Sequence, residues 1–179
     1  IRPLRRKHLK EDLAIIKDIF EEAWSDNWGF LPFTDAEFAE IGQQLKLLVE
    51  DDFVQIAEID GEPMAMLVAF PNMHEVIRDL NGHLFPWGWL KILWRLKVSY
   101  PRSGRVALMG VRKRFQSSPM GAAMAYGLIE AVREAGLRKQ IQHVEMSWIL
   151  EENKRMRHIL ESLGAEPYKT YRIYEKHLQ

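Results

Sequence analysis

The chain has 179 residues, of which 47% are apolar, and this is enough for a single domain with a hydrophobic core. Lysine and arginine together number 25, as do aspartate and glutamate, so the net charge of zero gives no argument for binding nucleic acid. The lack of cysteine excludes disulfides, a thiolate nucleophile and a zinc–thiolate site, and it fits a cytoplasmic protein.

No apolar run is long enough to cross a bilayer, so we expect no transmembrane segment. The six histidines lack the spacing of metal ligands, and we expect no metal site. We expect one domain over residues 1–179. The chain begins at Ile1 rather than methionine, so it could be a fragment, with a second domain in the full chain.

The first fifty residues predict a short strand followed by two helices. Residues 1–4 form the strand, and apolar positions at helical spacing predict a helix over Lys10–Trp24. Thr34 and Glu37 have the spacing of a capping box, which predicts the start of a second helix that runs to about Val49.

A hairpin and a long connection follow. Phe53–Ile59 and Pro63–Phe70 are predicted strands, joined by Asp60-Gly61, a strong hairpin signal. The connection over 73–104 is longer than most loops and contains a helix-like segment at Trp87–Lys97 that is rich in Trp and Leu. This segment could be a lid, a dimer face or a helix on a membrane surface. We favour a packed helix or a lid.

The central stretch predicts a buried strand over Val106–Val111, a basic turn, a loop of small residues and a helix to about Gly136. A loop that opens a helix points backbone N–H groups at the positive end of the helix dipole, where a phosphate binds well. From Leu80 to Ile129 the sequence has no acidic residue but eight lysines and arginines, which suits a ligand with several phosphates. The alternatives are that the loop is an ordinary strand-to-helix connection and that the basic residues form a solvated face.

The C-terminal part predicts a strand, a helix and a closing strand. Over His143–Ile149, polar and apolar residues alternate, and the polar row could face a substrate cleft or be satisfied by neighbouring groups. A helix begins after Asn153 and stops at Gly164, and the last strand spans Tyr168–Tyr174.

The segment Gln116-Ser-Ser-Pro-Met-Gly121-Ala122 after Val111 resembles the acetyl-CoA loop of the GNAT N-acyltransferases. One departure is Pro119, which stands where the family has its first glycine and has no N–H to give a phosphate. The resemblance implies an α/β (α+β) fold, with a mixed, mostly antiparallel central sheet and helices on both faces. It also implies that the strands at 106–111 and 143–149 run parallel around a crossover helix.

The resemblance implies an enzyme that moves an acetyl or other short acyl group from acyl-CoA to the amine of a small molecule or peptide. Acetyl-CoA would be the donor, and the Val111 N–H could polarise its thioester carbonyl. The expected cofactor-binding residues are Met109, Val111, Gln116, Ser117, Ser118, Met120, Gly121, Ala122 and Asn153. We expect Gly121 to let phosphate and backbone approach closely.

Three residues are candidates for catalysis. Glu145, or Glu151 through a water, could act as the base that deprotonates the amine. The family's thiolate-protonating tyrosine aligns with Leu160, which cannot donate a proton, and Tyr168 is a candidate replacement. The expected residues of the acceptor pocket are Trp24, Trp28, Phe30, Ser147 and Trp148, although core packing would explain the tryptophans equally well.

The alternative is a degenerate domain of the same fold that binds a ligand or partner without catalysis. Pro119 and Leu160 are the residues that favour this alternative. A homodimer is also possible.

Overall fold

In the computed structural model, residues 1–146 and 148–176 are described, without the side chains of residues 43–47. The chain divides into two compact units, Ile1–Trp148 and Ile149–Gln179, and each is described by itself.

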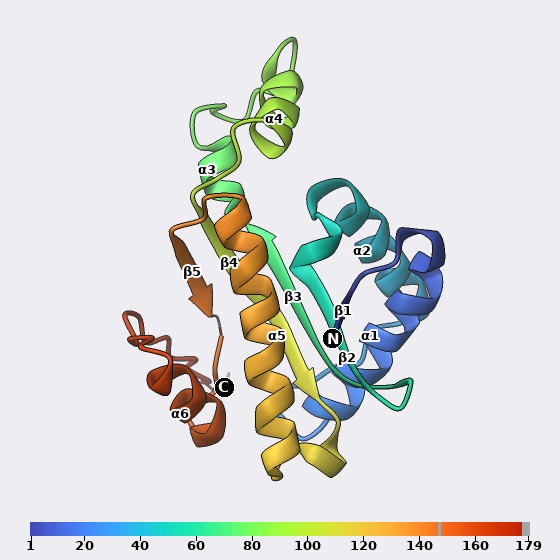
Figure 1. Ribbon diagram of the computed structural model, residues 1–179. Helices are drawn as coiled ribbons and strands as arrows, with labels where there is room; N and C mark the ends of the chain where they lie inside the picture. The colour runs from blue at the N-terminus through green and yellow to red at the C-terminus, as the bar shows by residue number, and fades with distance from the viewer. Residues whose placement is uncertain (147, 177–179) are drawn as a thin grey trace. The chain divides into compact units, whose positions relative to one another are not determined.

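The first unit is built on a five-stranded sheet in the order β1-β2-β3-β4-β5 (Figure 1). Neighbouring strands are antiparallel except for β4 and β5, which are parallel. The strands are β1 (Arg2–Pro3), β2 (Val54–Ile59), β3 (Glu62–Pro71), β4 (Ser103–Val111) and β5 (His143–Met146). The expected mixed, mostly antiparallel sheet is therefore confirmed, and β5 is shorter than its sequence pattern predicted.

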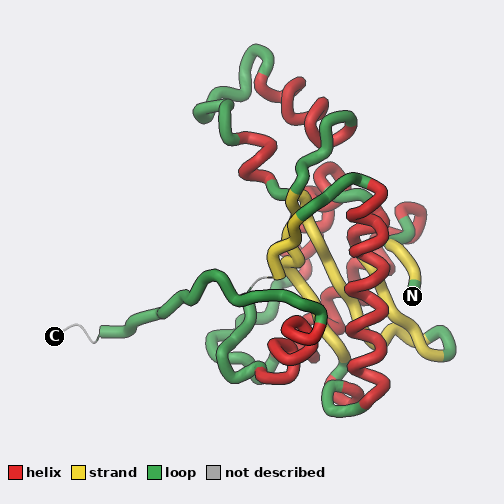
Figure 2. Tube along the Cα trace, turned by 60° about the vertical axis from the view of Figure 1, so that its left-hand side comes forward, coloured by secondary structure: helices red, strands yellow, loops and turns green. Residues whose placement is uncertain are grey.

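Helices cover both faces of this sheet, as expected: α1 (Leu9–Trp24) packs on one face and α5 (Pro119–Arg138) on the other (Figure 1). The other helices of this unit are α2 (Asp35–Leu48), which contacts α1, and α3 (Met73–Ile77) and α4 (Gly88–Lys97), which contact each other. Figure 2 shows α5, the crossover between the parallel strands, lying across the strands. The predicted capping box opens α2, because Thr34 Oγ1 accepts from the Glu37 N–H at 3.3 Å and Glu37 accepts from the Thr34 N–H at 2.9 Å.

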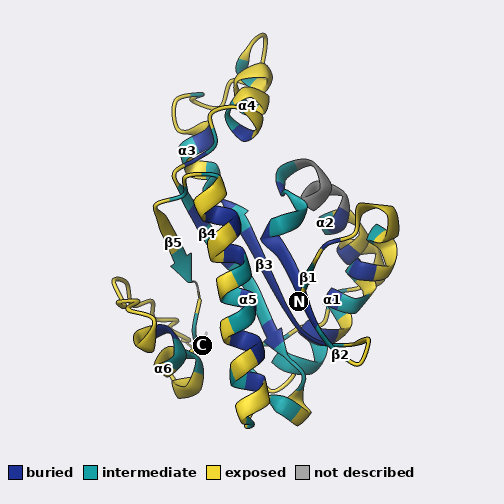
Figure 3. Cartoon of the chain, viewed as in Figure 1, coloured by how far each residue is buried: buried dark blue, intermediate teal, exposed yellow. Residues whose placement is uncertain are grey.

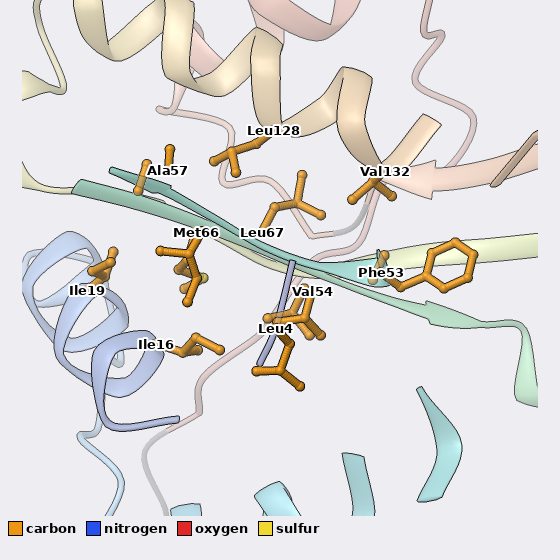
Figure 4. Packing of buried hydrophobic residues seen from close by; sticks show 14 of the residues in the cluster. Leu4, Ile16, Ile19, Phe53, Val54, Ala57, Met66, Leu67, Leu128 and Val132 are labelled. Atoms are coloured by element: carbon orange, nitrogen blue, oxygen red, sulfur yellow. The ribbon is translucent and has the colours of Figure 1, made fainter. Parts of the chain in front are cut away.

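The core lies on both sides of β2 and β3, whose residues are nearly all buried (Figure 3). Met66 faces Ile16 and Ile19 of α1, while the next residue, Leu67, faces Leu128 of α5 (Figure 4). Successive side chains of a strand point to opposite faces, so β3 contributes to both halves of the core.

A buried carboxylate ties the first strand to α1. Asp12 of α1 is fully buried and accepts hydrogen bonds from the Arg2 guanidinium at 2.9 and 3.0 Å and from the Arg5 N–H at 2.7 Å. Burial alone would raise the pKa of Asp12, but the hydrogen bonds from Arg5 and Arg2 outweigh it and lower the pKa to about 2. Asp12 is thus charged and fully paired.

The long connection between β3 and β4 forms an arm of residues 73–102 that contains α3 and α4. The helix predicted at Trp87–Lys97 is present as α4, but it does not pack on the core of the sheet. Of its residues only Leu96 is buried, and its packing partner is α3 (Figure 3). Among the described residues, no helix has both the length and the apolar composition to cross a bilayer.

The second unit contains α6 (Lys154–Ser162), which begins and ends as predicted. Asn153 caps it by accepting from the Met156 N–H at 3.2 Å, and Gly164 follows its end with a positive φ of 85°. The closing strand predicted at Tyr168–Tyr174 is absent, because the described residues from 165 onward pair with no strand (Figure 2). Their alternating sequence has no backbone partner to form a ladder.

Candidate functional site

The β4–α5 loop (residues 112–118) and the start of α5 form the segment that the sequence marks as a phosphate site. Ser118 is the N-cap of α5: its Oγ accepts from the Gly121 N–H at 3.1 Å and donates to the Phe115 carbonyl at 2.9 Å. Pro119 is the first helical residue, where a missing N–H costs nothing to the helix. Side-chain capping thus uses one of the amides expected to bind phosphate.

Other amides of this segment are also used internally. The N–H groups of Gln116, Ser118 and Ala122 donate to the carbonyls of Lys113, Phe115 and Ser118, at 3.2, 2.9 and 3.2 Å. The Met120 N–H has no acceptor among the described residues and is the remaining donor of the first helical turn. The segment therefore offers a phosphate fewer donors than the sequence pattern suggests.

The structure gives a reason for glycine at position 121 that the sequence does not reveal. A Cβ at this position would overlap the backbone carbonyl of Phe115, so any side chain would displace the loop. The close approach that requires glycine is between two parts of the same chain. This contact explains the glycine without a ligand, and a role of Gly121 in binding phosphate stays a prediction.

The cations of the β4–α5 loop are already neutralised. Arg112 pairs with Asp18 and Glu22, each at 2.6 Å, and its Nε donates to the Pro63 carbonyl at 2.8 Å. The next two basic residues pair in the same way, Lys113 with Asp26 at 2.7 Å and Arg114 with Glu62 at 3.0 Å. Acidic residues from α1, the loop after it and the β2–β3 hairpin thus cancel the charge of this acid-free stretch.

The second half of β4 has an open edge. Its pairing with β5 covers Ser103–Val106 only. At the same place the register with β3 shifts, so that Ala107 is an extra residue opposite Val68 and Ala69. A bulge of this kind bends a strand and increases its twist. Beyond Ala107, β4 has no described strand beside it on the β5 side.

The direction of the backbone groups at this edge follows from three hydrogen bonds. The Arg112 N–H donates to the Met64 carbonyl of β3 at 2.9 Å, so Met109 and Val111, at the alternate positions, face away from β3. Their carbonyls confirm this, because they accept from side chains outside the sheet: Met109 from Trp24 Nε1 and Val111 from Gln116 Nε2, both at 3.0 Å. The N–H groups of Met109 and Val111 thus point into the open edge, and we find no acceptor for either among the described residues.

The aromatic residues expected in an acceptor pocket separate into three environments. Trp24 and Phe30 are half-buried and pack on Phe20, with ring centroids 5.0 and 5.5 Å apart, while Trp28 is exposed. Trp148 is exposed, with the Arg105 guanidinium 5.7 Å from its ring centroid. Ser147 lies outside the described residues. Trp24 is the one that reaches the open edge, a role that aromatic composition alone could not identify.

Glu145 does not lie at the open edge. It is level with Arg105 across the parallel pair, and Arg105 precedes Val111 by six residues, which is about 20 Å along a strand. The structure therefore separates Glu145 from the Val111 N–H, and the two cannot act on the same thioester carbonyl.

The candidates of the second unit have their own local partners. Glu151 is exposed and pairs with Arg172 at 3.1 Å, and the exposed Tyr168 ring lies 4.8 Å from Lys169 Nζ. The amide oxygen of Asn153 is used by the helix cap, and Leu160 is buried. Their assignment to the site stays a prediction.

No protein-family model matches the chain. Solved structures resemble it over nearly its whole length. The aminoglycoside acetyltransferase AAC(6')-Iy, in complex with a bisubstrate analogue, has a TM-score of 0.59 and 18% identity over 99% of this chain and 97% of its own. A probable acetyltransferase has a TM-score of 0.58 and 14% identity over 100% and 99%.

The chain has the GNAT fold. Within that GNAT fold, the crossover helix and the parallel strand pair lie where the resemblance of the sequence placed them.

Two curated relatives are much more similar in sequence. Protein YghO of Escherichia coli is 54% identical over 178 residues, which are 99% of this chain and 46% of the relative. The bacterial ceramide synthase of Caulobacter vibrioides is 43% identical over the same shares of the two proteins. The chain thus spans about half the length of the curated relatives it matches.

Proposed function

We propose that this chain carries the acyl transfer site of an acyl-CoA-dependent N-acyltransferase, with acetyl-CoA or a longer acyl-CoA as the donor. The observation that carries the proposal is the open edge of β4, where two N–H donors, of Met109 and Val111, are free beside the start of α5. A thioester carbonyl held there would accept a hydrogen bond that strengthens as negative charge develops on its oxygen.

The proposed reaction uses a backbone N–H group and requires few catalytic side chains. A neutral amine attacks the thioester carbon, the oxyanion accepts from the Val111 N–H, and the thiolate of CoA leaves as the amide forms. A thiol with a pKa of about 8.5 is a tolerable leaving group near neutral pH, so the transfer proceeds without a general acid at Leu160. Positioning of the two reactants provides much of the rate.

The acidic residues that contact the β4–α5 loop are poor candidates for the base. Asp18, Glu22 and Asp26 are all paired with cations of this loop. The hydrogen bond from Lys113 also lowers the pKa of Asp26, which makes it a poorer base. In our proposal the amine loses its proton to water.

For the acceptor we propose a long-chain amine. The name of the Caulobacter relative, a bacterial ceramide synthase, describes the formation of an amide on a long-chain amino alcohol. The acceptors in the names of the structural neighbours are aminoglycosides, but these neighbours share only 12–18% identity with this chain. The half-buried Trp24, whose Nε1 donates to the Met109 carbonyl, provides apolar surface at the open edge. A cytoplasmic location and a homodimer stay predictions.

A second candidate function is a domain of the same fold that binds a ligand or partner without catalysis. The paired cations and internally used amides of the β4–α5 loop favour it, because the pyrophosphate of acyl-CoA would find few free donors there. Under this alternative the purified protein would acylate no amine.

The test combines calorimetric titration of acetyl-CoA and a long-chain acyl-CoA with an acylation assay. The assay offers a long-chain amino alcohol and an aminoglycoside. We expect Val111→Pro to remove the edge donor without losing a β3–β4 hydrogen bond, and to lower kcat by about a hundredfold. Val111→Ala keeps the N–H and is the matched control. No acyl-CoA binding at millimolar concentration and low salt would overturn the proposal, and binding without turnover would establish the second candidate.

A further inference from the structure

The arm between β3 and β4 is a folded element with an exposed apolar surface. Its fold is held from within: Asp79 pairs with Lys91 at 2.5 Å and with Arg95 at 2.5 and 2.9 Å, and Arg95 also donates to the Val76 carbonyl at 2.7 Å. Val76 of α3 and Leu96 of α4 are buried between the two helices. The arm therefore has a defined conformation and its own small core.

The base of the arm is equally well defined. Asn72 caps α3 by accepting from the His74 N–H at 3.0 Å, and its amide donates to Ser103 Oγ at 2.8 Å. Glu75 accepts from the Arg102 N–H at 3.0 Å and from Ser103 Oγ. These contacts fix the arm to the end of β3 and the start of β4, so its outer surface has a fixed position on the first unit.

That outer surface is apolar. Three of the six tryptophans of the chain lie on it, Trp87, Trp89 and Trp94, with exposures of 72, 44 and 61%. Five further exposed side chains join them, namely Leu84, Phe85, Leu90, Leu93 and Val98. Figure 3 shows α4 mostly in the colour of exposed residues. Water-exposed apolar groups on this scale mark a surface that contacts a protein or a membrane.

The charge on the arm distinguishes between these two partners. The arm has five lysines and arginines (Arg78, Lys91, Arg95, Lys97 and Arg102) but only two carboxylates, Glu75 and Asp79. Both carboxylates are used inside the arm, and no carboxylate among the described residues forms an ion pair with Arg78, Lys97 or Arg102. The surface therefore combines apolar side chains with an excess of exposed positive charge.

A second copy of the arm would be a poor partner for this surface. A two-fold contact places the same patch on both sides, so two surfaces with an excess of positive charge would face each other without a free acid of the arm to balance Arg78 and Lys97. An anionic bilayer complements both features. Tryptophan rings are favoured at the level of the lipid headgroups, and lysine and arginine are attracted to an anionic surface.

We propose that the arm is a membrane-docking element, and that α4 lies in the headgroup region of an anionic bilayer with Trp87, Trp94 and Leu90 inserted among the lipids. Arg78, Lys97 and Arg102 contact the anionic headgroups. This inference is independent of the acyl transfer proposed above, because it uses no residue of the β4 edge or the start of α5. It would also bring the enzyme to the surface that holds a long-chain amine.

The experiment is co-sedimentation of the purified protein with vesicles of phosphatidylcholine alone and of phosphatidylcholine with phosphatidylglycerol. We expect binding to the vesicles with phosphatidylglycerol, and weaker binding as salt rises because screening weakens the contacts of the cations. The double variant Leu90→Ser with Trp94→Ser should reduce the partition at least tenfold. Trp28→Ser, an exposed tryptophan outside the arm, is the matched control and should bind like the native protein.

A charge variant tests the second half of the proposal. Arg78→Glu with Lys97→Glu should abolish the preference for phosphatidylglycerol, while Lys10→Glu, on exposed α1 surface, should keep it. Unchanged melting temperatures confirm that the exposed substitutions leave the fold intact. Equal sedimentation of the native protein and the Leu90→Ser, Trp94→Ser variant overturns the proposal. So does an absence of vesicle binding together with a dimer that the same variant dissociates, which would identify a second copy as the partner.

Discussion

The β4–α5 loop and most of the arm lie in one acid-free stretch of sequence, but the fold neutralises their cations to different extents. Arg112, Lys113 and Arg114 of the loop all pair with carboxylates from distant parts of the first unit. In the arm, Lys91 and Arg95 pair with Asp79, whereas Lys97, Arg102 and the preceding Arg78 have no such partner in the described part of the chain. A run of positive charge in sequence thus becomes a charged surface only where the fold brings no acids to it. Unpaired positive charge that attracts an anionic ligand is therefore found on the arm and not on the β4–α5 loop.

The largest expected difference in stability between the two segments comes from replacing one glycine in each. Gly121→Ala should cost about 3 kcal/mol, because its Cβ overlaps the Phe115 backbone and the tightly bonded loop must move. Gly82→Ala in the arm meets no atom and bears only the strain of its φ of +79°, about 1 kcal/mol. Urea denaturation of both variants measures the difference. Equal costs would show that the loop is as free to adjust as the arm.

A smaller effect concerns the other fully paired cations, Arg2 and Arg5, and the Asp12 carboxylate between them. A pKa lowered in the folded state contributes stability above the unfolded value of about 3.9, and this stability is lost as the pH falls toward the folded value of about 2. We expect about 2 kcal/mol to disappear between pH 5 and pH 2. Denaturation curves at several pH values measure this loss, and Asp12→Asn should remove it from the pH dependence. An identical pH dependence in the variant would exclude Asp12 as its source.

The smallest effect compares one cation from each segment. Arg112→Met should cost about 1.5 kcal/mol, because it removes a half-buried guanidinium, leaves the Pro63 carbonyl without its donor and leaves Glu22 with the Lys113 N–H alone. Lys97→Met should change stability by less than about 0.5 kcal/mol, because its side chain is exposed and unpaired in the described structure. Thermal unfolding measures both values. A loss at Lys97 as large as that at Arg112 would contradict the division between paired and free cations.

Much of the fold could be predicted because its signals are local. The capping box at Thr34 and Glu37, the Asp60-Gly61 turn and the cap at Asn153 each act within a few residues, and each is confirmed. The α4 helix was visible in the same way. Its exposure was not, because a helix rich in Trp and Leu gives the same sequence pattern whether it packs on a core or projects from it.

The candidate site was only partly predictable for a related reason. The sequence marked the segment around Gln116 and Gly121, but it did not show that Ser118 and neighbouring carbonyls use most of its amides. The open edge depends on the bulge at Ala107 and on where β5 stops pairing, and both arise from contacts between strands far apart in the chain. Pairing across such distances has no short sequence signature, so the sequence does not show how far Glu145 lies from Val111 along the sheet.

The open edge of β4 also bears on self-association. An exposed strand edge normally recruits another polypeptide, which must both donate to its carbonyls and accept from its N–H groups. Here the carbonyls of Met109 and Val111 are occupied by Trp24 and Gln116, so an incoming strand would find half of its hydrogen bonds already taken. The edge is closed to β-sheet extension but open to an extended small molecule that only accepts. Two side chains from other segments thus make this edge a poor template for another strand and, under the proposed function, leave its N–H groups for a ligand that only accepts.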